Sequence, residues 1–130
     1  MDGYGEKVVD HFQHPRNAGV IDSANGVGES GDPGRGDFLK VFLKVEENTI
    51  VDLKYQVRGS PASIACASAM SELAIGKNLD EAIMIADEDI VEALEGLPES
   101  KLHCSNLASM ALRKAIIDHF DNHGREEGVG

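Results

Sequence analysis

The chain has 130 residues and a formal net charge of −11, from 12 Lys and Arg against 23 Asp and Glu. That length suits one domain with a single core, and the acidic balance argues against partners such as nucleic acid or a membrane surface, which attract clustered cations. Two cysteines are too few for a disulfide framework. No apolar run approaches the roughly 20 residues of a membrane span, and the acidic first residues are unlike a signal peptide. We expect a cytoplasmic protein with one domain over residues 1–121 and a disordered tail over residues 122–130.

An amphipathic helix and a glycine-rich loop open the chain. Tyr4, Val8 and Phe12 are spaced by four residues, which places them on one stripe of a helix. Pro15 ends this helix, because the residue before a proline is disfavoured in helical geometry. Residues 17–36 hold six of the 14 glycines. Little regular structure is expected there beyond a short edge strand, and a loop of this length in a small domain is often functional.

The middle of the chain predicts a β-hairpin. Apolar and polar residues alternate over residues 38–45 and again over residues 51–57, on either side of a polar turn at residues 46–49. The apolar face of the second run comprises Val51, Leu53, Tyr55 and Val57. Alternation with period two indicates antiparallel strands with one face buried and one face in water.

Helices follow the hairpin. Ser60 suits an N-cap and Pro61 the first helical position, and Gly76 suits the left-handed end of this helix. Short helices are expected over residues 79–85 and 87–94, and a last helix from Cys104 or Ser105 to about Phe120. Strands that precede helices, rather than alternate with them, favour an α+β fold. We predict a small antiparallel sheet, made of the hairpin and a short edge strand, covered on one face by helices.

The candidate chemistry gathers around one thiol. Cys104 stands near a predicted helix N-terminus beside His103, and both the helix dipole and a neighbouring base favour a thiolate. A structural cysteine packed under the helix start is the equally weighted alternative. Cys66 lies mid-helix among alanines and is expected in the core. Asp37 and Ser60 flank the open end of the hairpin and should lie close together.

Several motifs in order resemble the U-type iron–sulfur cluster assembly scaffolds, the IscU proteins and the N-terminal domain of NifU. The opening YGEKVVDHFQHPRNAG resembles the family's first helix and its Pro-Arg-Asn-x-Gly turn. The segment GKNLDEA resembles the stretch after the family's central helix, and KLHCSNLA resembles its Lys-x-His-Cys signature. The resemblance covers nearly the whole chain. It implies the fold shared by IscU and SufE, a non-enzymatic scaffold function, and a cysteine desulfurase as partner.

The resemblance also shows what this chain has lost. The family's site has three cysteines, an aspartate and a histidine. Arg35 stands at the first cysteine position and Ser60 at the second, whereas Asp37, His103 and Cys104 match the other ligands. A [2Fe–2S] cluster needs four ligands, mostly thiolates. The remaining three suit a single Zn²⁺ or Fe²⁺ with one open position, and the Arg35 cation is expected to stand where a metal would arrive and to favour the thiolate.

Three hypotheses follow for this divergent member. The first is a cluster-assembly protein that binds one metal, or a cluster completed by ligands from elsewhere. The second is a sulfur acceptor that carries a persulfide on Cys104, as the SufE proteins do with one cysteine. The third is a non-catalytic regulator that keeps only the docking surface. The family's chaperone-recognition stretch, Leu-Pro-Pro-Val-Lys, is reduced here to residues 97–101 (Leu97-Pro98-Glu99-Ser100-Lys101), which argues against an Hsp70-type partner. A monomer or a small homo-oligomer is expected.

Overall fold

The computed structural model describes residues 3–123. Most of the tail predicted for residues 122–130 therefore lies outside the described residues, while residues 122 and 123 belong to the last helix. The elements in chain order are α1 (Glu6–Gln13), β1 (Gly26–Gly31), β2 (Phe38–Glu46), β3 (Thr49–Arg58), α2 (Pro61–Ala74), α3 (Leu79–Ala82), α4 (Asp87–Ala93), the 3-10 turn η1 (Glu99–Lys101) and α5 (His103–His123).

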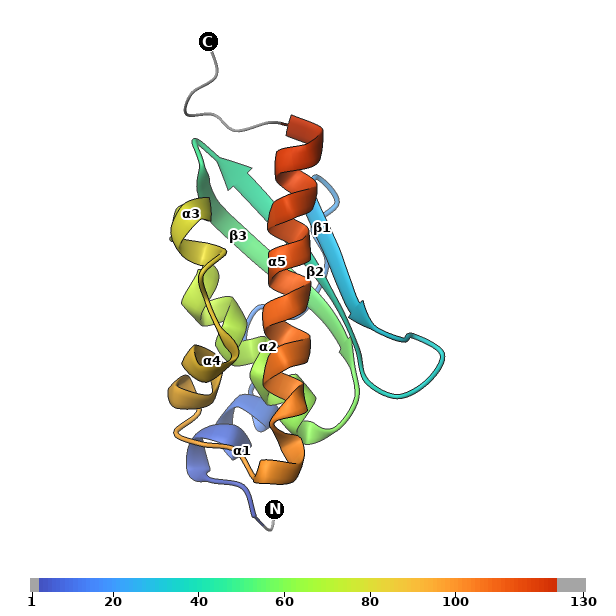
Figure 1. Cartoon of the computed structure of the whole chain (residues 1–130), viewed down its shortest axis with the longest axis vertical. Helices are drawn as coiled ribbons and strands as arrows, with labels where there is room; N and C mark the ends of the chain where they lie inside the picture. Colours follow the sequence, from blue (N-terminus) through green and yellow to red (C-terminus); the bar gives the residue numbers. More distant parts are fainter. Residues whose placement is uncertain (1–2, 124–130) are drawn as a thin grey trace.

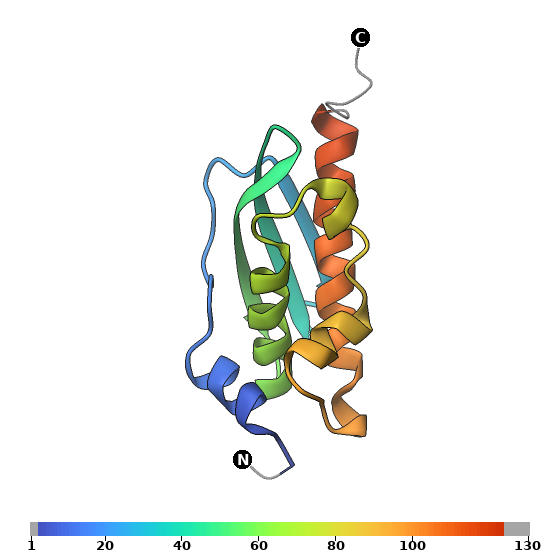
Figure 2. The same cartoon turned by 90° about the vertical axis from the view of Figure 1, so that its left-hand side faces the viewer.

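The predicted α+β fold is confirmed. The three strands form one antiparallel sheet in the order β1–β2–β3. Helices α2 and α5 pack against one face of this sheet, and α4 packs on α5 (Figures 1 and 2). The buried residues of β2 are those that the alternation predicts, Leu39, Val41, Leu43 and Val45. Among the described residues, no helix is both long enough and apolar enough to span a membrane.

The predicted apolar face of β3 is wrong at one position. Lys44 pairs with Asp52 but Val45 pairs with Ile50, so Val51 is an extra residue in the ladder. This β-bulge moves Ile50 onto the buried face and leaves Val51 45% exposed. Strict alternation cannot predict the change, because a single inserted residue inverts the side on which every later side chain lies.

Helix α5 lies unusually close to β1, and two glycines of that strand allow it. A Cβ at Gly28 would collide with the backbone of Ala115 and would lie 2.6 Å from the carbonyl oxygen of Ala111. A Cβ at Gly26 would lie 2.7 Å from the carbonyl oxygen of Ala115. Two glycines of the predicted loop therefore belong to the edge strand, where they let the helix backbone approach the sheet.

The segment that follows α1 contacts α2 and then runs along the outer edge of β3 (Figure 2). Ala18 forms a parallel bridge with Tyr55, and the amide of Gly19 donates to the carbonyl of Tyr55 over 2.9 Å. The amide of Arg16 donates to Oγ of Ser68 on α2 over 2.9 Å. The bridge at Tyr55 covers part of the outer edge of β3, which would otherwise be free to pair with another chain.

Candidate metal centre

Three segments that are distant in the sequence meet at the end of the molecule where α2 and α5 begin (Figure 1). One ligand atom each from Asp37, His103 and Cys104 lies within 4.8 Å of the other two. Nε2 of His103 is 3.3 Å from Oδ2 of Asp37 and 3.6 Å from Sγ of Cys104. Ser60 lies beside them, with its Oγ 3.8 Å from the same sulfur. The structure thus brings Asp37, His103 and Cys104 together, as predicted. That these three residues bind a metal stays a prediction.

The hairpin places Asp37 and Ser60 at the same end, as predicted. Phe38 pairs with Arg58, so the residues just outside this pair, Asp37 and Gly59, are neighbours. A Cβ on Gly59 would collide with Oδ1 of Asp37 and would lie 2.9 Å from Oγ of Ser63. Glycine at position 59 therefore leaves the space that the Asp37 carboxylate occupies.

The thiol of Cys104 is completely buried and is surrounded by hydroxyls. Oγ of Ser63 donates to its sulfur over 3.3 Å, and Ser60 is the N-cap of α2, accepting from the amide of Ser63. The N-cap role of Ser60 was predicted, whereas the role of Ser63 was not. Ser63 lies three residues after the cap, in the first helical turn, but only the packing of α2 against α5 brings its hydroxyl to the sulfur.

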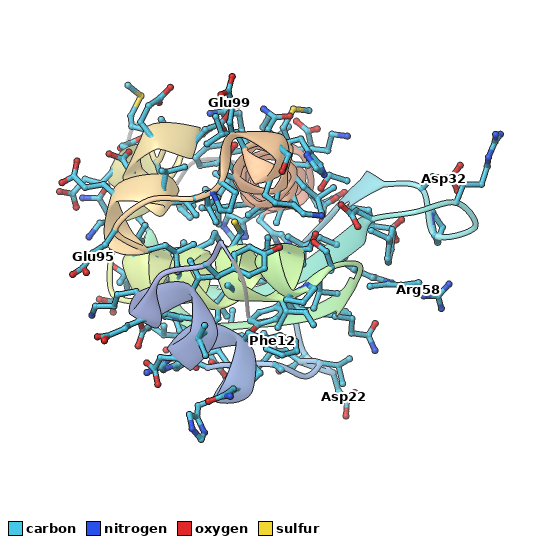
Figure 3. All side chains as sticks on the ribbon, turned by 90° about the horizontal axis from the view of Figure 1, so that it is seen from below. Phe12, Asp22, Asp32, Arg58, Glu95 and Glu99 are labelled. Carbon is cyan, nitrogen blue, oxygen red and sulfur yellow. The ribbon has the colours of Figure 1, made fainter. Side chains whose placement is uncertain are left out.

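Arg35 is exposed and is not one of the three gathered ligands. It belongs to the loop between β1 and β2, which projects from the body of the molecule and carries the labelled Asp32 (Figure 3). The side chain of Arg35 is exposed, and it forms no ion pair or hydrogen bond with any residue that the structure describes. The guanidinium therefore has no direct polar contact with the three ligands, and its effect on an arriving metal stays a prediction.

The other cysteine and the most buried histidines have structural environments. Cys66 is completely buried on α2, and burial raises the pKa of its thiol well above the ordinary value. Nδ1 of His11 lies 2.8 Å from Oγ of Ser68, and Nδ1 of His119 lies 2.9 Å from the carbonyl oxygen of Asn25. Cys66 therefore behaves as a core residue, as predicted.

Two of the three spacings in the donor set match those around a single metal ion. Bond lengths to zinc of about 2.0–2.3 Å at a tetrahedral angle place neighbouring ligand atoms about 3.3–3.6 Å apart. The two spacings around Nε2 of His103 already match, at 3.3 and 3.6 Å. A [2Fe–2S] cluster needs a fourth donor, and Ser60 is a poor one because its hydroxyl is hard to deprotonate and already caps α2.

Comparison with known proteins shows which family has this architecture. The family model described as the NifU-like N-terminal domain matches residues 3–126. The chain belongs to the NifU-like N-terminal domain family. One relative, iron–sulfur cluster assembly scaffold protein IscU 1 of Archaeoglobus fulgidus, is 49% identical over 126 residues, which are 97% of this chain and 82% of the relative. Iron–sulfur cluster assembly scaffold protein IscU of Escherichia coli K12 is 43% identical over 120 residues, 89% of this chain and 93% of the relative.

A solved structure has the same fold. FiSufU of Fervidobacterium islandicum AW-1, described as a candidate scaffold protein for iron–sulfur cluster assembly in the SUF system, superposes with a TM-score of 0.72. The alignment covers 87% of this chain and 96% of FiSufU at 24% identity. At that identity the likeness supports the family fold, and the chemistry of the site has to be argued from the residues of this chain.

Proposed function

We propose that this member of the NifU-like N-terminal domain family is a non-enzymatic scaffold protein of iron–sulfur cluster assembly in the cytoplasm. It receives one Fe²⁺, as cargo, through Asp37, His103 and Cys104, and Zn²⁺ competes for the same ligands. The observation that carries the proposal is the convergence of a carboxylate, an imidazole and a thiol within 4.8 Å in a chain whose relatives are named scaffold proteins.

Each ligand has a distinct role in this proposal. Cys104 binds as the thiolate, and the hydroxyl of Ser63 donates to its sulfur and stabilises that charge. His103 binds through Nε2, so its proton must reside on Nδ1. Asp37 supplies a second negative charge, so the ion and its two anionic ligands are together neutral. Three protein donors leave one position of a tetrahedral ion open for sulfide or for a donor from a partner.

A cysteine desulfurase is the partner that we propose to deliver the sulfur. The alternative, a persulfide carried by Cys104 itself, is less well supported, because the thiol is completely buried. A persulfide acceptor must expose its sulfur to the donor enzyme, whereas a metal ion can reach the sulfur beside His103, whose side chain is 60% exposed. No Hsp70-type chaperone is included, because only part of the recognition stretch is present at residues 97–101.

Binding of Co²⁺ under anaerobic conditions tests the metal site, because a cobalt–thiolate bond gives a near-ultraviolet charge-transfer band that reports directly on the sulfur ligand. We expect the band in the unmodified chain, and we expect Cys104→Ser to abolish it and to weaken binding by more than about 100-fold. Cys66→Ala is the matched control, since it removes the other thiol, and it should keep the band. Persistence of the band in Cys104→Ser would contradict the proposed site.

Reconstitution with Fe²⁺ and sulfide tests the number of donors. We expect no stable [2Fe–2S] spectrum from the unmodified chain, and we expect one from Ser60→Cys, which adds a fourth donor at a position whose present Oγ lies 3.8 Å from the sulfur of Cys104. Adding Cys104→Ser to Ser60→Cys should remove the spectrum again. A stable cluster on the unmodified chain alone would show that a donor outside Asp37, His103 and Cys104 completes the site.

A further inference from the structure

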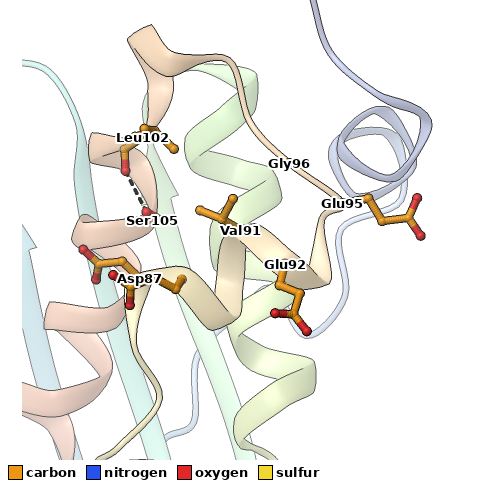
Figure 4. A pocket seen from close by; sticks show the side chains of 8 residues that line it. Asp87, Val91, Glu92, Glu95, Gly96, Leu102 and Ser105 are labelled. Carbon is orange, nitrogen blue, oxygen red and sulfur yellow. Dashed lines mark hydrogen bonds between the residues drawn. The ribbon is translucent and has the colours of Figure 1, made fainter.

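A groove between α4 and the start of α5 lies outside the ligand set. It has a volume of about 720 Å³. Val91 of α4 and Leu102 face each other across it, and Glu92 and Glu95 point outward at its edge (Figure 4). Leu102 is 43% exposed, which makes it one of the few large apolar side chains on the described surface. The groove therefore combines an apolar floor with a negatively charged rim.

No Lys or Arg side chain among residues 3–123 neutralises the charge of the rim. Four of its eight lining residues are carboxylates, Asp87, Glu88, Glu92 and Glu95, and none is Lys or Arg. Asp87 accepts hydrogen bonds from Asn106 and Ser109. The other three carboxylates form no hydrogen bond or ion pair within residues 3–123. Glu88 and Glu92 stand four residues apart on α4, where like charges repel each other.

The backbone also places one of these charges at a conformational cost. Glu95 adopts a φ of +59°, in the left-handed region that glycine or asparagine occupies more easily. Gly96 follows with a φ of +108°, and its amide donates to the carbonyl of Val91 over 2.9 Å to close the end of α4. The turn itself does not require a carboxylate at position 95, so the charge there adds to the rim rather than to the fold.

We propose that this groove docks a basic amphipathic helix of a partner protein. The apolar side of that helix would contact Val91 and Leu102, and its Lys or Arg side chains would pair with Glu88, Glu92 and Glu95. A purely apolar ligand does not suit a lining that is half carboxylate, and nucleic acid or an anionic membrane would be repelled. This inference goes beyond the proposed metal site and does not depend on it. Leu102 directly precedes His103, so the docked partner would lie beside the metal ligands.

The test uses a synthetic 18-residue peptide with leucine on one helical face and lysine on the other, labelled for fluorescence anisotropy. A second peptide replaces every leucine with serine at the same charge. Binding is measured for the unmodified chain, for Glu88→Gln with Glu95→Gln, and for Leu102→Ser. The matched control is Asp22→Asn with Glu46→Gln, which removes two exposed carboxylates remote from the groove. Amide shifts in ¹⁵N spectra locate the bound peptide.

We expect the groove double variant and Leu102→Ser each to raise Kd by about fivefold or more at low salt, and the control by less than about twofold. The largest amide shifts should fall on α4 and on residues 102–105. Equal weakening by the control variant, equal binding of the serine peptide, or shifts centred elsewhere would overturn the proposal. The Co²⁺ band is recorded on the same variants and should be unchanged, so failure of the docking surface is distinguishable from failure of the metal site.

Discussion

The close approach of α5 to β1 makes Gly28→Ala the most informative single substitution. A methyl group at this position would collide with the amide of Ala115 and would lie 2.6 Å from the carbonyl oxygen of Ala111 and 2.7 Å from the carbonyl carbon of Lys114. All three are backbone atoms of a helix, so they cannot rotate away as a side chain could. The helix has to move away from the sheet, or the strand has to bend.

Two effects of opposite sign decide the outcome. Without the collision, alanine in a strand would be more stable than glycine by about 0.5–1 kcal/mol, because glycine loses more backbone entropy on folding. Overpacking of a well-packed interior costs about 1–3 kcal/mol. The collision with backbone puts Gly28→Ala at or above that range, so we expect a net loss of about 1–3 kcal/mol. For a domain of this size the loss lowers Tm by about 4–11 °C.

Thermal unfolding followed by circular dichroism measures this effect, with Gly34→Ala as the matched control. A Cβ at Gly34 would meet only Oδ1 of Asp32, at 3.5 Å, in an exposed loop. The control should change the free energy of unfolding by less than about 0.5 kcal/mol. Because α5 carries His103 and Cys104 at its start, Gly28→Ala should also weaken Co²⁺ binding. An unchanged or raised Tm in Gly28→Ala would refute the close packing of α5 on β1.

Three further predictions concern buried polar groups. Burial raises the pKa of Tyr55 to about 12, and its buried hydroxyl lies near Ser68 without a well-aligned hydrogen bond among the described residues, so Tyr55→Phe should be neutral or stabilising by up to about 1 kcal/mol in urea denaturation. Burial lowers the pKa of His11, so the folded chain binds a proton there only at a lower pH than the unfolded chain, which binds one below about pH 6.5. The contribution of His11 to stability should therefore be complete above pH 6.5, and the free energy of unfolding should fall by at most about 1.4 kcal/mol per pH unit below it. The urea midpoints at pH 7.5 and pH 5.5 should differ less in His11→Asn than in the unmodified chain. An equal difference in the two proteins would argue against His11 as the origin of the pH dependence. Ser63→Ala removes the hydroxyl that donates to Cys104 and should weaken Co²⁺ binding by about 10–100-fold at similar Tm, whereas unchanged affinity would make the contact incidental.

Local patterns were sufficient for most elements of the fold. The alternation in residues 38–45 predicts the buried face of β2, and Ser60 with Pro61 predicts the start of α2, because both depend on neighbouring residues only. The hairpin register also predicts that Asp37 and Ser60 lie close, since strand pairing fixes the neighbours at its open end. Cys66 as a core residue follows in the same way from its position among alanines.

The site itself depends on contacts between distant segments. Whether His103 and Cys104 join Asp37 is decided by how α5 lies on the sheet, and that depends on Gly28 and on the small residues that face it. The hydroxyl of Ser63 reaches the sulfur for the same reason.

Two other features show the same division between local pattern and tertiary packing. The bulge at Val51 arises from pairing with another strand, and the projection of the loop that carries Arg35 is visible only in the folded molecule. The sequence by itself determined which residues are helical, extended or apolar, because those properties are local. Only the tertiary structure decided which of them meet, because a contact between distant residues depends on every packing interface between them.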